Sequence, residues 1–401
     1  MKKLLLATVA SMALAGAASA EEVKLGIFIG FTGPIESLTG HMAAAAEAAM
    51  KEVSDSGKFM NGSTVVSVRA DSTCAVDTAA GTAAAERLIT AEGVKGIIGG
   101  DCSGITGAVL QNVARPNGMV MISPSATSPA LTTAEDDGLF FRTAPSDARE
   151  GEVMAEILVE KGIKSIALTY TNNDYGKGLA EAIATAFQAK GGTITINAAH
   201  EDGKADYSAE VAALASAGGD LLVVAGYLDQ GGKGIIQASL DSGAFTTFGL
   251  PGGMVGDSLP AAIGPALDGS WGQVAQSDSA GAAILTEMGK TAATPFDATS
   301  PYTMESYDAA ALILLAMQAA GSTDPKVYKD KVLEIANGPA DGSGVKILPG
   351  ELGKALELIA AGTAIDYDGA SGVTLIGPGE SAGRYRQFEV KGGKYETVQF
   401  R

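Results

Sequence analysis

The sequence predicts an α/β protein built from two doubly wound parallel-sheet lobes. Short runs rich in β-branched residues alternate along the chain with longer segments whose apolar residues recur at helical spacing. Glycine makes up 53 of the 401 residues, which favours many tight turns between these elements. The series begins again after Asp147. Such alternation predicts parallel sheets between layers of helices, and the restart indicates a second lobe.

Residues 1–20 have the features of a cleaved signal peptide. Lys2 and Lys3 precede an apolar run over 4–14, and Ala18-Ser19-Ala20 supplies the small residues that signal peptidase accepts. The apolar run is about half of the roughly 20 residues that a membrane anchor requires. We therefore expect cleavage after Ala20 and a soluble, exported mature chain.

Composition excludes several classes of protein. The chain has 46% hydrophobic and 18% charged residues, which is too apolar for a disordered protein. It carries 46 acidic against 28 basic residues, a formal net charge of -18. Because this excess charge repels phosphate backbones, we expect no nucleic-acid partner.

The first lobe is expected to contain residues 21–143 and about 276–382. Its strands are each followed by a loop and, in three cases, by a helical pattern. We expect these strands over 23–29, 64–68, 94–98 and 119–122. The last of them ends in a polar loop, where Pro124 and Pro129 prevent a helix from continuing.

The second lobe is expected to contain residues 144–275 and about 383–401. It begins with a helix over 150–161, and its strands are expected over 165–170, 193–196, 221–225 and 245–250. Beyond Trp271 the sequence predicts helices over 280–291, 302–320 and 327–336, with too few strands for a third sheet. Ligands of doubly wound sheets bind outside the carboxyl ends of the strands. We therefore expect a ligand cleft between the lobes.

The two cysteines each follow a predicted strand. Cys74 follows the second strand and Cys102 the third. Neighbouring strands lie about 4.8 Å apart, within the Cα separation that a disulfide allows. In an oxidising compartment this placement favours a bridge over two free buried thiols. Two cysteines with only His41 and His200 do not make a convincing four-ligand zinc cluster, so no metal is expected.

The sequence also lacks the common catalytic motifs. A G-x-S-x-G turn at Ser103 would need glycine where Asp101 stands, and no phosphate-binding glycine motif follows a strand. His41 and His200 are interpreted as surface residues, and the adjacent carboxylates of Asp136-Asp137 as solvated ones. We expect neither enzymatic activity nor a cofactor.

The remaining polar and aromatic residues at strand ends indicate a binding site. Ser103 begins the helix after the third strand, where free N–H groups favour a carboxylate; the alternative is a plain N-cap. Ser125 and Thr127 add donors from the adjacent loop. Tyr175 and Tyr227 occupy equivalent places in the second lobe, where a ring can close over a small ligand.

Several motifs together resemble the periplasmic leucine, isoleucine and valine binding proteins of ABC transporters, which are type I periplasmic binding proteins. The resemblance covers nearly the whole mature chain. The motifs are Thr32-Gly33-Pro34, Cys74 before Asp77, residues 97–99 leading into Cys102-Ser103, the loop 123–129, Arg142-Thr143 with Asp147, the loop 173–178, Gly226-Tyr227 and Tyr307-Asp308-Ala309.

The resemblance implies a function and a set of site residues. It implies an extracytoplasmic, monomeric solute-binding protein that captures a small amino acid or related carboxylate and presents it to the permease of an ABC importer. The alternatives are a ligand-sensing subunit of a signalling receptor and an exported hydrolase. It also implies two lobes joined by three crossovers and a Cys74–Cys102 bridge. The ligand carboxylate is expected on Ser103 and Thr127, its ammonium on the Ser125 carbonyl and the Thr127 hydroxyl, with Tyr175 and Tyr227 from the second lobe.

One residue of the family's pattern is absent. Where the amino-acid binders have a glutamate for the ammonium, this chain has Pro251-Gly252-Gly253. A desolvated ammonium needs a charged partner. Asp101, Asp147 and Asp229 are the candidates to replace the glutamate.

Overall fold

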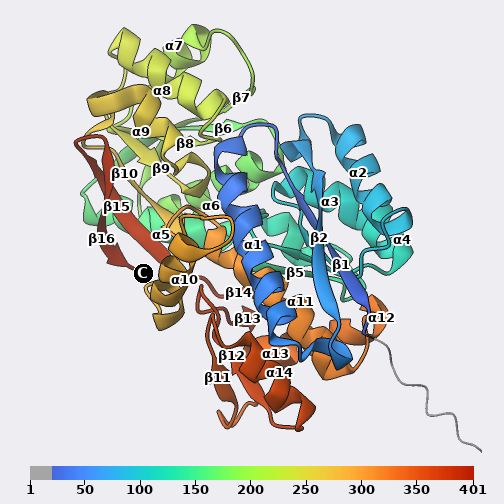
Figure 1. Ribbon diagram of the computed structural model, residues 1–401. Helices are drawn as coiled ribbons and strands as arrows, with labels where there is room; N and C mark the ends of the chain where they lie inside the picture. The colour runs from blue at the N-terminus through green and yellow to red at the C-terminus, as the bar shows by residue number, and fades with distance from the viewer. Residues whose placement is uncertain (1–19) are drawn as a thin grey trace, which may run out of the picture.

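The computed structural model describes residues 20–401. The predicted signal peptide, apart from Ala20, lies outside the described residues. Two seven-stranded sheets with flanking helices form two lobes, and Figure 1 shows the second lobe with α7 and α8 at the top and the first lobe at the right. The predicted fold class is confirmed.

The first sheet has the strand order β13-β14-β5-β4-β3-β1-β2. The strands from β1 to β5 are parallel, and only β13 runs antiparallel to its neighbour. The bounds are β1 Glu22–Ile29, β2 Thr64–Asp71, β3 Ile97–Gly99, β4 Met121–Ser123, β5 Phe140–Pro145, β13 Leu375–Ile376 and β14 Glu380–Ser381. The core strands are continuous apolar runs, as expected for a sheet covered on both faces.

The second sheet repeats this plan with the order β16-β15-β10-β9-β8-β6-β7. Strands β6 to β10 are parallel, and β15 and β16 add an antiparallel edge. The bounds are β6 Ser165–Thr171, β7 Thr193–His200, β8 Leu221–Ala225, β9 Phe248–Leu250, β10 Trp271–Ala275, β15 Tyr385–Lys391 and β16 Lys394–Phe400.

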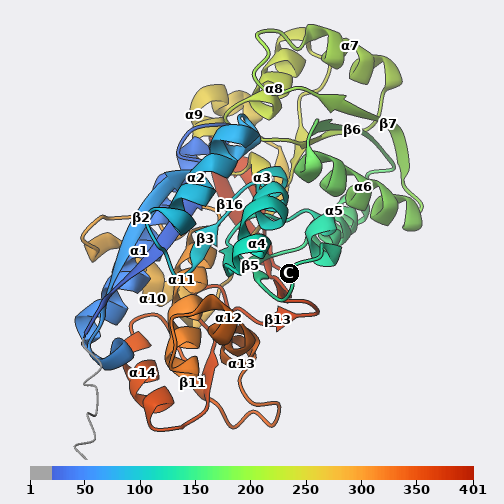
Figure 2. The same ribbon diagram turned by 90° about the vertical axis from the view of Figure 1, so that its right-hand side faces the viewer.

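Helices cover both sheets, as Figures 1 and 2 show from two directions. The helices that begin before residue 200 are α1 Glu36–Ser56, α2 Thr78–Thr90, α3 Ser103–Val109, α4 Arg115–Asn117, α5 Asp147–Glu160 and α6 Asp174–Ala189. The later ones are α7 Ser208–Ala217, α8 Gly231–Ser242, α9 Ser258–Ile263, α10 Ala280–Thr291, α11 Thr303–Ala320, α12 Pro325–Tyr328, α13 Val332–Asn337 and α14 Leu352–Ala360. Helix α11 is buried from Thr303 to Met317 and packs against α1, so it forms the centre of the first lobe.

The chain passes between the two sheets three times. It enters the second sheet between β5 and β6, returns after β10, and enters it again between β14 and β15. These are the three predicted crossovers. They bring the first turn of α5 and the strands β10 and β15 to the region where the lobes meet.

The prediction of too few strands for a third sheet is wrong. Val345–Ile347 (β11) and Ile365–Tyr367 (β12) pair in parallel as a separate two-stranded sheet. Each strand has only three residues, and α14 connects them. Segments this short carry no recognisable periodicity, which is why they were not predicted. Figure 1 shows this sheet beside α13 and α14 at the bottom of the molecule.

The prediction of a surface position for His200 is also wrong. Strand β7 continues four residues past its predicted end and closes on His200, whose side chain is buried. Its Nδ1 lies 2.9 Å from the hydroxyl of Thr169, and its ring meets Tyr207 edge-on. Burial lowers the pKa of His200 to about 4, so the ring is neutral at pH 7. His41 is half-exposed on α1 and accepts the N–H of Asp297 at 3.1 Å.

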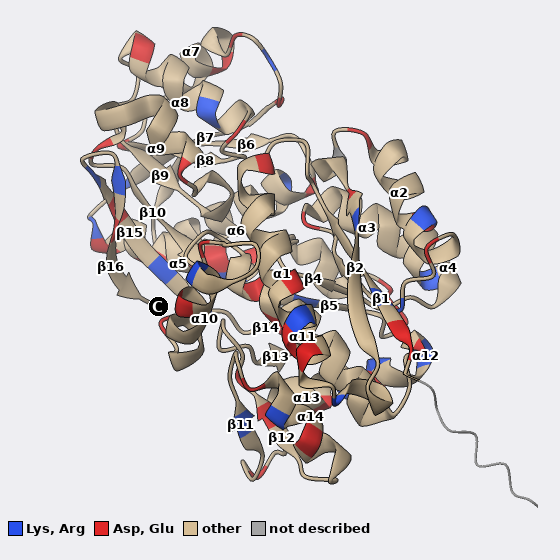
Figure 3. Ribbon diagram, viewed as in Figure 1, with Lys and Arg blue, Asp and Glu red and all other residues tan. Residues whose placement is uncertain are grey.

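Across residues 20–401, no helix is both long and apolar enough to cross a bilayer. Figure 3 shows acidic and basic residues spread over both lobes. The acidic excess of the sequence is therefore not gathered in one patch of this view.

Candidate functional site

The predicted binding residues of the first lobe follow β3 and β4. Ser103 is the first residue of α3, and Cys102 occupies the capping position, so the alternative of Ser103 as a plain N-cap is wrong. The Ser103 hydroxyl oxygen instead accepts the N–H of Ser128 at 3.1 Å. This bond fixes the loop that carries Thr127 next to the start of α3.

That loop holds one free hydroxyl. The Ser125 hydroxyl donates to the carbonyl of Asp101 at 3.0 Å. The Thr127 hydroxyl is buried and has no hydrogen-bond partner among the described residues. The Arg142 guanidinium donates to the carbonyls of Ala126 and Ser128, at 3.1 and 2.9 Å, and so supports the loop. The loop is therefore held by its neighbours while the Thr127 hydroxyl stays available.

Asp101 and the cysteines have a structural role. The Asp101 carboxylate accepts the N–H of Gly30 at 2.7 Å and the hydroxyl of Ser72 at 2.6 Å. Cys74 and Cys102 form the predicted disulfide, with a Cα–Cα distance of 5.1 Å. The side chains of Asp101 and the two cysteines lie together, but both sulfurs are used in the bridge, so no thiolate is left for a metal.

Two carboxylates lie on the first turn of α5. Ser146 caps this helix, and Asp147 and Glu150 fall on one face because they are three residues apart. Asp147 is fully buried, and neither of its carboxylate oxygens has a hydrogen-bond partner among the described residues. Thr127 and Glu150 nevertheless lie close enough to influence its pKa. The N–H of Asp147 donates to the Thr127 carbonyl at 2.8 Å, which joins α5 to the loop of the first lobe.

Glu150 is held by the second sheet. Its Oε1 accepts the N–H of Gly252 at 2.7 Å and the Nε2 of Gln273 at 3.1 Å. Burial raises the pKa of Glu150 to about 7. Burial, and then the charge of Glu150, raise the pKa of Asp147 well above its usual range.

The absence of a side chain at residue 252 now has a physical reason. A Cβ on Gly252 would lie 2.8 Å from the Tyr302 hydroxyl and 3.5 Å from Oε1 of Glu150. Tyr302, directly before α11, and Glu150 thus fill the space that a side chain at residue 252 would need. Of the three candidates for the absent glutamate, Asp147 lies in this cluster with free oxygens.

The two predicted tyrosines belong to the same cluster. The rings of Tyr175, on the first turn of α6, and Tyr227, after β8, stack with centroids 5.0 Å apart. The Tyr175 hydroxyl oxygen accepts the N–H of Gly253 at 3.0 Å. Burial first, and then the charges of Glu150 and other neighbours, raise the pKa of Tyr175 well above its usual range.

Asp229 lies elsewhere and links the lobes. Its carboxylate accepts the N–H and the hydroxyl of Ser37 on α1, at 3.1 and 2.7 Å, and the hydroxyl of Ser258 at 2.6 Å. Its N–H donates to the Pro34 carbonyl at 3.1 Å. Asp229 thus has protein partners in both lobes.

A cavity of about 550 Å³ lies between the lobes, and residues of the cluster around Asp147 do not line it. Its lining includes Ser37, His41, Ser258 and Arg386. On the paired strands β10 and β15, Arg386 lies opposite Val274. The neighbouring residue Gln273, which contacts Glu150, lies opposite Gln387. Since successive residues of a strand point to opposite faces, this cavity is on the other face of the sheet from Glu150.

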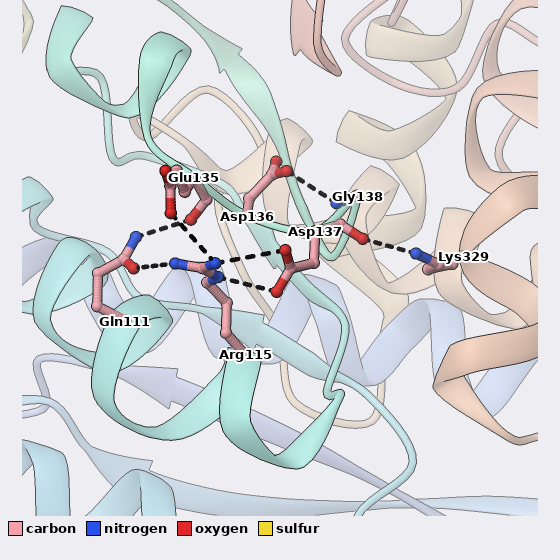
Figure 4. Close-up of polar contacts among 7 residues, drawn as sticks. All are labelled: Gln111, Arg115, Glu135, Asp136, Asp137, Gly138 and Lys329. Carbon is pink, nitrogen blue, oxygen red and sulfur yellow. Dashed lines mark hydrogen bonds and ion pairs between the residues drawn. The ribbon is translucent and has the colours of Figure 1, made fainter.

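The adjacent carboxylates of Asp136 and Asp137 are surface groups, as predicted. Asp136 accepts the N–H of Gly138 at 2.8 Å, and Asp137 pairs with Arg115 at 3.0 Å. Figure 4 shows the two side chains pointing to these separate partners. They do not form an acid pair.

Sequence reasoning missed Glu150, Gln273 and Tyr302. The i, i+3 spacing from Asp147 on a helix that follows a strand end could have identified Glu150. Gln273 stands within an otherwise apolar central strand, and Tyr302 comes from a distant segment, so no local pattern indicates either one.

Comparisons with known proteins assign the chain to a family. A family model described as a periplasmic binding protein matches residues 22–336. Leu/Ile/Val-binding protein homolog 1 of Brucella melitensis is 31% identical over 344 residues, which cover 82% of this chain and 89% of that protein. The substrate-binding protein BasB of a chemotactic signal transduction system in Halobacterium salinarum is 28% identical over 372 residues, covering 88% and 83%. A crystal structure of a leucine-binding protein from Thermotoga maritima has a TM-score of 0.77 at 20% identity, covering 94% and 98%.

Proposed function

The chain belongs to the periplasmic binding protein family and is a solute-binding protein, and we propose that it captures a small amino acid or a related carboxylate between its lobes. We further propose that it delivers this solute, as a monomer, to the permease subunits of an ABC importer. The leader 1–20 would be removed after Ala20 during export to the periplasm.

One observation carries the ligand proposal. The buried Thr127 hydroxyl and both carboxylate oxygens of Asp147 have no partner among the described residues, and they meet where the lobes join. Buried polar groups almost always have hydrogen-bond partners, so this pattern supports a solute that supplies them. The Thr127 and Ser103 hydroxyls can donate to a carboxylate, while the Asp147 oxygens can accept from a nitrogen.

The division into lobes supports a closing motion. We propose a first lobe of residues 21–143 and about 276–382 and a second lobe of 144–275 and about 383–401. The three crossovers act as the hinge between them. The contacts of Asp229 with Ser37 and Pro34 belong to the closed arrangement and stabilise it when solute is bound.

A sensing role is the second candidate. The relative from Halobacterium salinarum is named as a substrate-binding protein of a chemotactic system, so one family fold serves uptake and sensing. The two roles differ in the membrane partner. Affinity capture with the solute-loaded protein distinguishes them: an importer component recovers permease subunits, whereas a sensor recovers a receptor.

A thermal-shift panel tests the proposed function. It compares the common amino acids with their deaminated carboxylates and their amides. A bound solute raises the midpoint of unfolding because it binds only the folded state. We expect stabilisation by at least one amino acid or carboxylate, and weaker or no stabilisation by its amide, which lacks the carboxylate charge. An amide that stabilises the protein as much as the acid does would contradict the carboxylate assignment.

A further inference from the structure

We propose that the cavity between α1 and the β15–β16 hairpin is a second binding site, in which Arg386 binds a small oxyanion such as a phosphate, a sulfate or a carboxylate. The cavity has a volume of about 550 Å³. It lies on the opposite face of β10 from the cluster around Asp147. The proposal goes beyond the proposed function because it assigns a second ligand to a second site, and it does not depend on which solute the first site binds.

The first argument is the unpaired charge of Arg386. Its Nε is buried and has no hydrogen-bond partner within residues 20–401, and its guanidinium forms no ion pair there. Every other arginine of these residues pairs with a carboxylate. The pairs are Arg69–Glu47, Arg87–Glu92, Arg115–Asp137, Arg142–Glu380, Arg149–Glu152, Arg384–Asp278 and Arg401–Glu160. The described chain thus provides a carboxylate for each arginine except the one in this cavity.

The second argument is the energetic cost of this charge. Burial lowers the pKa of Arg386, and the electrostatic influence of Tyr395, Asp297 and Asp257 raises it by less. An arginine usually has a pKa above about 12, so the guanidinium remains a cation at pH 7. A buried cation without a hydrogen-bonded anion is costly. An oxyanion would remove this cost, because a guanidinium presents several N–H groups in one plane to carboxylate or phosphate oxygens.

The two acidic residues of the lining do not provide that anion. The Asp297 carboxylate accepts the N–H and the hydroxyl of Thr299 at 2.8 and 2.7 Å. Asp257 is exposed, directly before α9. Both influence the pKa of Arg386, but neither pairs with it in the part of the chain that the structure describes. Lys394 on β16 also lines the cavity, so the lining has two basic residues against these two acidic ones.

The rest of the lining adds hydrogen-bond donors from the first lobe. His41 on α1 accepts the N–H of Asp297 with its Nδ1 at 3.1 Å, so a neutral ring carries its proton on Nε2. Ser300, shortly before α11, adds a half-buried hydroxyl. Since Arg386 lies in the second lobe, an anion in this cavity would have donors from both lobes.

Thermal unfolding of the full mature chain tests the site with three probes, which are inorganic phosphate, sulfate and succinate. Sodium chloride at the same ionic strength is the reference, because screening alone changes the stability of a charged protein. A ligand that binds only the folded state raises the midpoint of unfolding. We expect at least one probe to raise the midpoint above the chloride reference, and calorimetry with that probe to show one anion bound per chain.

Two matched variants assign the effect to Arg386. Arg386→Gln removes the charge and should weaken binding of the best probe roughly tenfold or more, since a hydrogen-bonded ion pair is lost. Arg384→Gln makes the same chemical change two residues earlier, where Arg384 is exposed and pairs with Asp278 at 3.0 Å. This control should bind the probe as tightly as the wild type does.

A third variant, Arg386→Lys, keeps the charge but lacks the planar group. It should bind the probe with an affinity between those of the wild type and Arg386→Gln. In chloride buffer neither substitution of Arg386 should lower the unfolding midpoint appreciably, because no ion pair within the described residues is lost. Circular dichroism of each variant checks that it is folded.

The outcomes keep this site apart from the solute site. If no probe stabilises the protein beyond the chloride reference, or if folded Arg386→Gln and Arg386→Lys both bind the probe as tightly as the wild type does, the anion site is overturned. The amino acids that stabilise the wild type should stabilise Arg386→Gln equally, and loss of that response in the folded variant would overturn a separate second site. A protein that binds the probe but responds to no member of the amino-acid panel contradicts the proposed function and leaves the anion site intact.

Discussion

Thr127 has a buried hydroxyl that does not stabilise the fold through a well-aligned hydrogen bond. Its carbonyl accepts the N–H of Asp147 and so ties the loop to α5. Its hydroxyl lies near the Asp147 carboxylate but forms no well-aligned hydrogen bond with any described residue. A Thr hydroxyl is seldom buried without a hydrogen bond. A substitution at this position should therefore weaken solute binding much more than it lowers the stability of the free protein.

We expect Thr127→Ala to weaken solute binding roughly tenfold or more, since one hydrogen bond to a charged group contributes about 1.5 to 3 kcal/mol. The free protein should lose only about 1 kcal/mol of stability, the cost of removing one buried methyl group, because the hydroxyl forms no well-aligned hydrogen bond with the described residues. Calorimetry and thermal unfolding measure the two quantities. Thr90→Ala is the control, since Thr90 is exposed at the end of α2. Loss of stability without loss of affinity would contradict the assignment.

At the scale of elements, the strand-end rule predicted which loops lie close together. Ser103, Thr127, Tyr175 and Tyr227 each follow a parallel strand, and the structure joins their loops through Asp147 and the backbone of residues 252–253. The rule found these residues because a doubly wound sheet directs its carboxyl-end loops to one edge. It could not find Gln273 in the middle of β10, whose role depends on the facing helix α5.

The length of the elements explains the errors in the predicted fold. Most long strands and helices were predicted because their apolar periodicity extends over many residues. The three-residue strands β11 and β12 fall below that length, and β7 was predicted too short because its last residues alternate less clearly. The wrong prediction for His200 follows from this error, because His200 is the last residue of β7 and is buried there.

The disulfide links two elements of the first lobe. Cys74 follows β2 and Cys102 caps α3, and the bridge closes a loop of 28 residues. Chain entropy assigns such a loop about 3 to 4 kcal/mol of stability. We expect the Cys74→Ser, Cys102→Ser double variant to lose roughly that free energy of unfolding in denaturant titrations. Intact mass of alkylated wild type should show no free thiol. An unchanged unfolding midpoint would contradict a structural role for the bridge.

For the whole molecule, closure depends on contacts that no single lobe can make. Asp229 in the second lobe bonds to Ser37 and Pro34 in the first, and the solute would add contacts from Thr127 on one side and Tyr175 on the other. A solute shifts the equilibrium toward the closed form only by its extra affinity for that form. In the proposed mechanism, the two lobes close about the three crossovers, and the contacts of Asp229 with the first lobe stabilise the closed form.

Small-angle X-ray scattering tests the central claim that solute is bound between the lobes. The protein is measured free and saturated with the amino acid that stabilises it most, with Asp229→Ala as a variant that lacks the interlobe bonds. We expect a smaller radius of gyration on saturation of the wild type, and a reduced change in Asp229→Ala. Superimposable profiles for the free and saturated wild type would contradict binding between the lobes.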